Sequence, residues 1–291
     1  MESSSNDVLA SLPESLGLAA LHLDFPRLQF HATAAGPESG ELVVLLHGFP
    51  ENWYSWRHQI PALSQAGFFV VAPDQRGYGL SGKAPPYDTT TLARDVVDLV
   101  HALGRERAHL VGHDWGAAVA WIVATDYPDV VDRLAILNVP HPAELMRALL
   151  GGDRRQLLKS WYAFFFQLPS LPERLLSAAG YRVMRRAMLG SAKPGTFSER
   201  DLAVYLSAWS QPGALRAMLG WYRAAFRPGS LRGRAYQRID APGLILWGER
   251  GRRATGRACR GEPPLARQGA ARPLSRGDPL GPRGPPQRGQ P

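Results

Sequence analysis

The sequence has few or none of several features that define large protein classes. A single cysteine, Cys259, excludes an internal disulfide. No run of about 18 apolar residues occurs, so the sequence predicts no transmembrane helix and no membrane partner. Residues 1–7 are polar and have no basic stretch ahead of an apolar one, which argues against a signal peptide. We therefore expect a cytoplasmic protein.

The positive charge of the chain is concentrated in its last part. The net charge is +9, a value that could indicate nucleic-acid binding. Residues 250–291 contain ten Arg, no Lys and two acidic residues, which gives +8 and leaves +1 for residues 1–249. The main part of the chain is thus typical of an ordinary soluble enzyme, and we expect no nucleic-acid partner.

Residues 251–291 also lack the side chains that build a core. They contain no Phe, Tyr, Trp, Ile, Val or Met, but eight Gly and eight Pro. Such a segment cannot bury enough apolar surface to offset the entropy lost on ordering, so we expect it to be disordered. The alternative is a basic arm for nucleic acid or a membrane, which salt-dependent binding would reveal.

Before residue 142, short apolar strands alternate with helical patterns. A length of 291 residues allows one α/β domain with a large core and an insertion. The alternation predicts a doubly wound, mostly parallel sheet, the arrangement of an α/β fold. The expected elements are a hairpin over 21–31, strands over 42–46, 68–71, 109–111 and 134–137, and helices over 53–66, 91–103 and 115–126.

The pattern changes from residue 142 to about residue 237. This part is helical and rich in aromatic residues, and we interpret it as an inserted lid, or cap. Turn signals divide it, and residues 244–247 then return to the sheet as a strand. The turn signals are Pro169, Gly180, Pro194-Gly195 and Pro212-Gly213. The expected units are 1–141 and 238–250 for the core, 142–237 for the cap and 251–291 for the tail.

Residues 111–121 have the pattern of a nucleophile elbow, in which a strand, a tight turn and a helix follow one another. They read Val-Gly-His-Asp-Trp-Gly-Ala-Ala-Val-Ala-Trp, and Gly112 and Gly116 permit the sharp turn and close helix packing. The turn presents Asp114 at the start of the helix. A carboxylate there can attack carbon and form an ester, which suits epoxides and alkyl halides. The alternative role for Asp114 is a plain helix N-cap.

Three motifs within residues 20–250 resemble those of epoxide hydrolases with the α/β-hydrolase fold. Residues 47–50 (His-Gly-Phe-Pro) are similar to the family loop whose backbone N–H helps to bind the oxyanion. Residues 76–81 (Arg-Gly-Tyr-Gly-Leu-Ser) resemble the loop after the next strand, where we expect Asp74 and Arg76 to form a stabilising pair. Residues 112–116 resemble the family's elbow with Asp. Related dehalogenases share all three motifs.

Two segments of the cap favour an epoxide hydrolase over a dehalogenase. Residues 161–169 and 221–223 resemble the family segments that carry two ring-opening tyrosines, here Tyr162 and Tyr222. Two phenols can hold the epoxide oxygen and protonate it, whereas an alkyl halide needs no such pair. The open alternatives are a haloalkane or haloacid dehalogenase and a non-catalytic ligand-binding protein.

The resemblance implies a reaction without a cofactor or metal. A hydrophobic epoxide would be attacked by Asp114, and water would then cleave the ester to a vicinal diol. The backbone N–H groups of Phe49 and Trp115 would stabilise the tetrahedral intermediate. The implied pocket residues are Trp115, Trp161, Phe165 and Trp221, and the residues that support the motifs are His47, Gly48, Pro50, Gly112, His113 and Gly116, with both histidines structural.

The sequence departs from the family in its water-activating pair. The family's catalytic histidine belongs after the last strand, but the last histidine here is His141. The family's acid belongs at position 251 or, in some relatives, at position 138, and these residues are Gly251 and Asn138. No catalytic histidine or acid is found, so we expect Asp114 to be alkylated but the ester to turn over poorly.

One hypothesis links these missing residues to the unusual tail, namely a one-nucleotide shift of the reading frame near codon 251. With a suitable choice of codons, residues 275–282 hide Pro-Glu-Ala-Thr-His-Trp-Val in the displaced frame. This string resembles the family's catalytic-histidine segment. Under this hypothesis, the last strand and helix of the core are missing from the chain.

Overall fold

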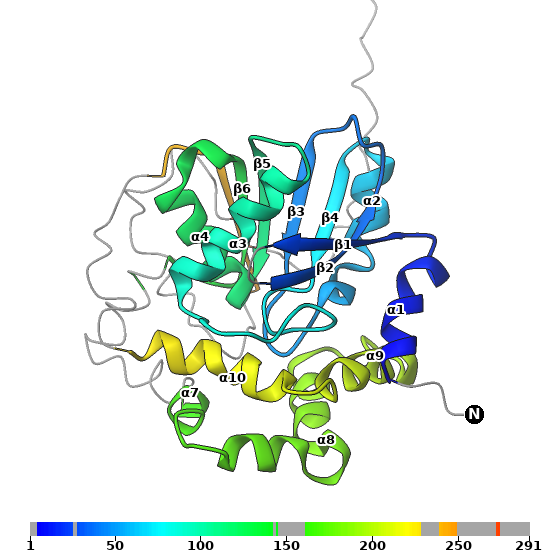
Figure 1. Cartoon of the computed structure of the whole chain (residues 1–291), viewed down its shortest axis with the longest axis vertical. Coiled ribbons are helices and arrows are strands. Elements are labelled where there is room, and N and C mark those ends of the chain that lie inside the picture. Colours follow the sequence, from blue (N-terminus) through cyan, green and yellow to red (C-terminus); the bar gives the residue numbers. More distant parts are fainter. Residues whose placement is uncertain are drawn as a thin grey trace, which may run out of the picture.

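A computed structural model describes residues 5–25, 28–141, 144, 161–227, 239–248 and 272–273. These residues form an eight-stranded sheet in the order β1-β2-β4-β3-β5-β6-β7-β8. Helices pack against the sheet, and a further group of helices lies beyond one end of its strands (Figure 1). The strands are β1 Ala19–Phe25, β2 Leu28–Ala35, β3 Leu42–Leu46, β4 Phe69–Pro73, β5 Ala108–His113, β6 Val131–Leu137, β7 Gly243–Trp247 and β8 Arg272–Pro273.

The sheet is antiparallel at one edge and parallel elsewhere. The strand β2 pairs antiparallel with both β1 and β4, and all pairs from β4 to β8 are parallel. Every residue of β3 and β4 is buried, as their continuous apolar sequences require of strands covered on both faces. The predicted fold class, a mostly parallel α/β sheet, is therefore confirmed. Parallel strands place their carboxyl ends at one edge, where ligands bind in such sheets.

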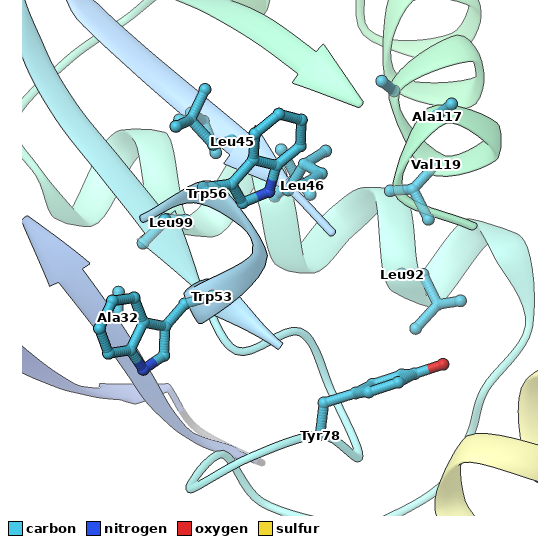
Figure 2. Close-up of a cluster of buried hydrophobic side chains, with 14 of the residues drawn as sticks. Ala32, Leu45, Leu46, Trp53, Trp56, Tyr78, Leu92, Leu99, Ala117 and Val119 are labelled. Atoms are coloured by element: carbon cyan, nitrogen blue, oxygen red, sulfur yellow. The ribbon is translucent and has the colours of Figure 1, made fainter. Parts of the chain in front are cut away.

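Short helices connect the strands of the core. The helix α4 is apolar on all sides and buried because it packs against β5, β6, β3 and α3. Side chains of β3, η1, α3 and α4 belong to one buried cluster, part of which is drawn in Figure 2. The core helices are α1 Ser5–Ser15, η1 Trp53–Trp56, α2 Gln59–Gln65, α3 Thr89–Ala102, α4 Trp115–Asp126 and η2 Pro128–Val130.

Two core elements differ from the sequence prediction. The helix expected over 53–66 is divided into η1 and α2, because Pro61 lacks the N–H that a continuous helix would need and its ring would clash one turn back. The helix α1 was not predicted. Its Leu9 and Leu12 are buried and α1 packs against the cap helix α9, so a contact distant in sequence stabilises it.

The cap helices lie between β6 and β7 in the sequence. Their ends follow the predicted turn signals, and the one at Gly180 is a kink inside α8, where residues 179–181 have φ of 49°, 63° and 59°. The predicted boundaries at 142, 237, 238 and 250 fall outside the described residues, as does most of the tail. The cap helices are α7 Trp161–Phe165, α8 Leu171–Ser191, α9 Glu199–Trp209 and α10 Ala214–Ala225.

Two indole hydrogen bonds attach the cap to the core. Trp209 on α9 donates its indole N–H to the carbonyl of Pro50, after β3, at 2.6 Å. Trp221 on α10 donates to the carbonyl of Arg76, after β4, at 3.0 Å. The cap therefore lies over the carboxyl ends of the parallel strands. Among the described helices, none is both long and apolar enough to cross a bilayer.

Candidate active site

The nucleophile elbow joins β5 to α4 through Asp114. This residue has φ 51° and ψ −121°, a conformation that non-glycine residues rarely adopt. A Cβ at Gly112 would lie 2.6 Å from the Cα of Ala117, and a Cβ at Gly116 would clash with the carbonyl of Leu46. The two glycines therefore allow the turn to form. It holds the carboxylate at the N-terminus of α4, where the helix dipole favours negative charge.

The loop after β3 supplies a hydrogen bond to this carboxylate. The backbone N–H of Phe49 donates to Oδ1 of Asp114 at 3.0 Å, and a side chain at Gly48 would clash with Asp114. His47 supports the loop, because its Nε2 accepts from the N–H of Gln75 at 3.1 Å and its Nδ1 lies 3.0 Å from the carbonyl of Gly48. Burial lowers the pKa of His47, which favours the neutral imidazole that these bonds require.

The two cap tyrosines come from different helices and meet beside the elbow. Tyr162 on α7 and Tyr222 on α10 have ring centroids 5.9 Å apart. The ring of Tyr222 also lies 5.3 Å from that of Phe49 and 5.1 Å from that of Trp115. Trp115 is the first residue of α4, where backbone N–H groups have no acceptor within the helix. The ring of Tyr222 is thus close to both residues predicted to form the oxyanion site, and Tyr162 lies next to that ring and lines the cavity described below.

A cavity of about 530 Å³ opens beside Asp114. Its volume is in the range of sites for small organic ligands. The helices α7 and α8 supply most of its apolar wall, and the loops at the ends of β3, β5, β6 and β7 supply its polar side. Cap side chains on the wall include Tyr162, Phe166, Leu176, Met184 and Met188.

Two of the four predicted pocket residues, Trp161 and Phe165, line this cavity. Trp221 does not. Its side chain is 1% exposed and lies in the contact between cap and core. There its indole N–H donates to the carbonyl of Arg76. Trp115 is half-buried between the rings of Trp221 and Tyr222 and is also absent from the cavity lining that the described residues form.

The loop after β4 is stabilised differently from the prediction. Asp74 and Arg76 do not pair with each other. Arg76 binds both carboxylate oxygens of Asp95 on α3 at 2.6 Å, and Asp74 accepts from Nδ1 of His31 on β2 at 2.9 Å. Asp74 also accepts from the N–H of Trp53. Partners on β2 and α3 are close to the loop only in the folded chain, so sequence distance could not reveal them.

His113 has a different position from the one expected. It was predicted to be structural, under the turn, but it lines the cavity next to Asp114. Its Nδ1 lies 3.3 Å from Oε2 of Glu51, another cavity residue that sequence reasoning missed. The signal was present, because Glu51 directly follows the His-Gly-Phe-Pro motif.

The other positions considered for water activation make structural contacts, and of them Asn138 also lines the cavity. The ring of His141 packs 5.3 Å from that of Trp121, and burial lowers the pKa of His141 to about 4. Asn138 has φ 60°, and its Oδ1 accepts from the N–H of Gly248 at 2.7 Å, which ties the end of β6 to the end of β7. Gly251 lies outside the described residues.

Known proteins resemble this chain in sequence and in structure. The family model of the alpha/beta hydrolase fold matches residues 41–253, ending near the change in composition after residue 250. The chain is 44% identical to the AB hydrolase superfamily protein YfhM of Bacillus subtilis, over 76% of this chain and 77% of that protein. It is 38% identical to Epoxide hydrolase 4 of Homo sapiens, over 76% of this chain but only 62% of the human protein.

The crystal structure of Bacillus megaterium epoxide hydrolase in complex with an inhibitor is similar in fold to this chain. It matches with a TM-score of 0.80 and 28% identity, over 88% of this chain and 92% of that one. The family match covers well over half of the chain, and the relatives include epoxide hydrolases from bacteria and animals. This chain therefore belongs to the α/β-hydrolase fold family, and its relatives within that family include epoxide hydrolases.

Proposed function

We propose that this protein opens hydrophobic epoxides by forming an ester with Asp114. The observation that carries the proposal is the hydrogen bond from the N–H of Phe49 to Oδ1 of Asp114, beside the paired rings of Tyr162 and Tyr222. A carboxylate held in this way is suited to attack on carbon, and the two phenols are suited to hold the oxygen that leaves that carbon.

The first step breaks one C–O bond and forms another. A carboxylate oxygen of Asp114 attacks an epoxide carbon, and the electron pair of the broken C–O bond goes to the epoxide oxygen. That oxygen takes a proton from Tyr162 or Tyr222. Water then cleaves the ester and releases a vicinal diol. Because residues 142–291 contain no histidine, we expect the second step to be slow and the ester to accumulate.

The apolar cavity favours an epoxide with an aromatic substituent. Aromatic side chains of the cap and the end of β7 line it, among them Trp161, Phe165 and Trp247. A mutant of the Bacillus megaterium epoxide hydrolase has been solved with (R)-3-[1]naphthyloxy-propane-1,2-diol, its product. That protein has a TM-score of 0.80 to this chain. We therefore choose an aryl glycidyl ether as the probe substrate.

Intact-mass analysis of the full chain after mixing with this epoxide tests the proposal. The expected result is an added mass equal to one epoxide, mapped to the peptide that contains Asp114 and absent from Asp114→Ala. A chain that binds the compound without any adduct or diol would contradict the proposal. Halide release from an aryl alkyl halide, with no reaction of the epoxide, would favour a dehalogenase instead.

A further inference from the structure

Charge is segregated between the described parts of the core and the cap. Residues 5–25 and 28–141 of the core contain seven basic and fifteen acidic residues, which gives a net charge of −8. Residues 161–227 of the cap contain nine basic and three acidic residues, which gives +6. The small net charge of residues 1–249 therefore conceals a basic cap above an acidic core.

The cap also carries most of the exposed apolar side chains. Eight of the ten large apolar side chains that are exposed among the described residues belong to it. Single exposed apolar side chains are common on soluble proteins, whereas a contiguous group marks a contact with a protein or a membrane. Six of the eight, exposed by between 44% and 62%, form a surface that we call the cap patch: Trp161, Phe164, Leu168, Leu171, Leu175 and Phe226.

The first part of the cap patch lies along α7. Trp161, Phe164 and Leu168 have the spacing of one helical face over α7 and the turn that follows it. The ring of Phe226, which follows α10, lies 5.1 Å from that of Phe164. These four side chains therefore form one continuous apolar surface.

The second part of the cap patch lies on α8. Leu171 and Leu175 are one turn apart at the start of this helix. Arg223 on α10 holds α8 beside the end of α7, because its guanidinium binds both Glu173 and the carbonyl of Leu168. In Figure 1, α7 and α8 lie on the side of α10 that is away from the sheet, so the cap patch is on the outer surface of the cap.

The mouth of the cavity opens next to the cap patch, between basic side chains. Trp161 and Val183 line the cavity and are also 62% and 52% exposed, so they reach from its wall to the surface. Arg182 and Arg186 lie one and three residues from Val183 on α8, and Arg174 lies between Leu171 and Leu175; all three arginines are exposed.

We propose that the outer surface of the cap binds anionic lipid bilayers, with the cap patch in the headgroup region and the cavity mouth facing the lipid. Apolar and aromatic side chains beside basic ones are typical of protein surfaces that lie in a membrane interface. The same lipid surface repels the acidic core, so the charge asymmetry also orients the molecule. The expectation of no membrane partner rested on the lack of a spanning segment, which this mode of binding does not need.

A bilayer fits this surface better than a protein partner does. A protein bound to the cap patch would cover the cavity mouth, whereas a hydrophobic epoxide dissolved in the bilayer could enter the cavity from it. This delivery of substrate rests on the proposed function, but the binding to lipid does not.

Cosedimentation of the full chain with vesicles tests the charge requirement. We expect binding to phosphatidylcholine vesicles with about 30% phosphatidylserine, little binding to pure phosphatidylcholine, and weaker binding as salt is added. Arg174→Gln with Arg186→Gln should weaken binding by roughly 10- to 30-fold, since each basic residue near an anionic surface contributes about fivefold. The control Arg283→Gln with Arg288→Gln removes the same charge from the tail and should weaken binding by less than about threefold.

A second pair of variants tests the apolar contact. Leu175→Ser should weaken binding by at least about threefold, because less apolar area leaves water. Leu16→Ser should have no effect, since it removes an exposed leucine of the core that is outside the cap patch. Circular dichroism and thermal unfolding check that all variants are folded.

Tryptophan fluorescence tests the orientation on the bilayer. All eight tryptophans lie within the described residues, and Trp161 is the one that is exposed. Lipids brominated in their acyl chains should therefore quench part of the fluorescence of the wild type and much less of that of Trp161→Phe.

These measurements use no epoxide, so their failure leaves the proposed function intact. Absence of binding, equal losses in the two double arginine variants, or binding without quenching of Trp161 would overturn the inference. Self-association that Leu175→Ser abolishes, in a chain that does not bind vesicles, would assign the cap patch to a second copy instead.

The delivery of substrate needs the reaction as its readout. An aryl glycidyl ether dissolved in the vesicles should alkylate the wild type faster than Arg174→Gln with Arg186→Gln, whereas the two proteins should react equally with the epoxide in free solution. Equal rates in vesicles would contradict delivery from the bilayer. Absence of any adduct in the wild type would overturn the proposed function, while the binding to lipid would stand.

Discussion

The backbone N–H of Phe49 and Oδ1 of Asp114 lie 3.0 Å apart, and this contact makes the two oxygens of the carboxylate inequivalent. The oxygen that accepts this bond is stabilised in the position of an oxyanion. The other oxygen is the one we expect to attack carbon. The geometry depends on the absence of a side chain at Gly48, where a Cβ would clash with Asp114.

Replacement of Gly48 by alanine should therefore slow ester formation. The new methyl group would push Asp114 away from the N–H of Phe49, and we expect alkylation to slow by about 100-fold, comparable to the loss of one oxyanion donor. The rate of adduct formation by mass spectrometry measures this effect. Gly190→Ala is the control, because a Cβ there meets nothing within 4 Å. Equal rates in the two variants would show that the close approach of Gly48 is unimportant.

The tyrosine pair should govern ring opening. We expect Tyr162→Phe and Tyr222→Phe each to slow alkylation by an epoxide by at least about 10-fold, and the double variant to slow it further, since proton transfer by a positioned group contributes about 100- to 10,000-fold. Tyr181→Phe is a suitable control, because the hydroxyl of Tyr181 donates to the carbonyl of Trp209 within the cap. Unchanged rates in the double variant would contradict the assignment of both phenols.

Asp74 should make the fold sensitive to acid. Burial alone would raise its pKa, but the hydrogen bond and charge of His31, with the N–H of Leu80, outweigh burial and bring the pKa below its usual value of 3.8. The stabilisation is then complete above the unfolded-state pKa of about 3.9 and is lost as the pH falls through the lower folded-state pKa. Urea unfolding between about pH 5 and pH 2.5 measures the loss.

The variant Asp74→Asn provides the comparison for that experiment. It should be destabilised at pH 7 by about 1–3 kcal/mol, because buried donors lose a charged acceptor. Its unfolding free energy should also fall less steeply in acid than that of the wild type. The same slope in both proteins would rule out Asp74 as the source of the acid sensitivity.

The buried ion pair of Arg76 and Asp95 should contribute more to the free energy of unfolding than the exposed pair of Arg94 and Asp98 on α3. Lysine cannot reproduce the two-pronged contact of the Arg76 guanidinium, so we expect Arg76→Lys to lower the unfolding free energy by about 1–3 kcal/mol. Arg94→Lys alters the exposed pair and should change the unfolding free energy by less than about 0.5 kcal/mol. Similar effects of the two variants would contradict a special role for the buried pair.

Sequence patterns predicted the elements that depend on local rules. The buried strand over 42–46 has the predicted bounds, and the turn signals at Gly180 and Gly213 coincide with left-handed backbone at both glycines. These features follow from residue types whose conformational preferences do not depend on the rest of the chain. The elbow was recognisable for the same reason, since its two glycines mark a turn that other residues would block.

Features that depend on tertiary contacts were not predictable in this way. The helix α1 is explained by its packing against α9, and Trp221 is removed from the pocket wall by a hydrogen bond to a loop far away in the sequence. His113 and Glu51 come together because β3 and β5 are neighbours in the sheet, although they are not consecutive in the chain. The roles of Asp114, Tyr162 and Tyr222 remain predictions that the experiments above address.

The way the cap is attached has a consequence for how substrate preference could evolve or be engineered. The helices α9 and α10 hold the core through Trp209 and Trp221, whereas the cap residues on the cavity wall all lie between 161 and 197. That wall segment is joined to α10 through Arg223, which binds Glu173 and the carbonyls of Phe166 and Leu168. Apart from Tyr162, the wall residues of this segment can therefore change the shape of the cavity without altering the contacts of Trp209 and Trp221 that hold the cap on the core.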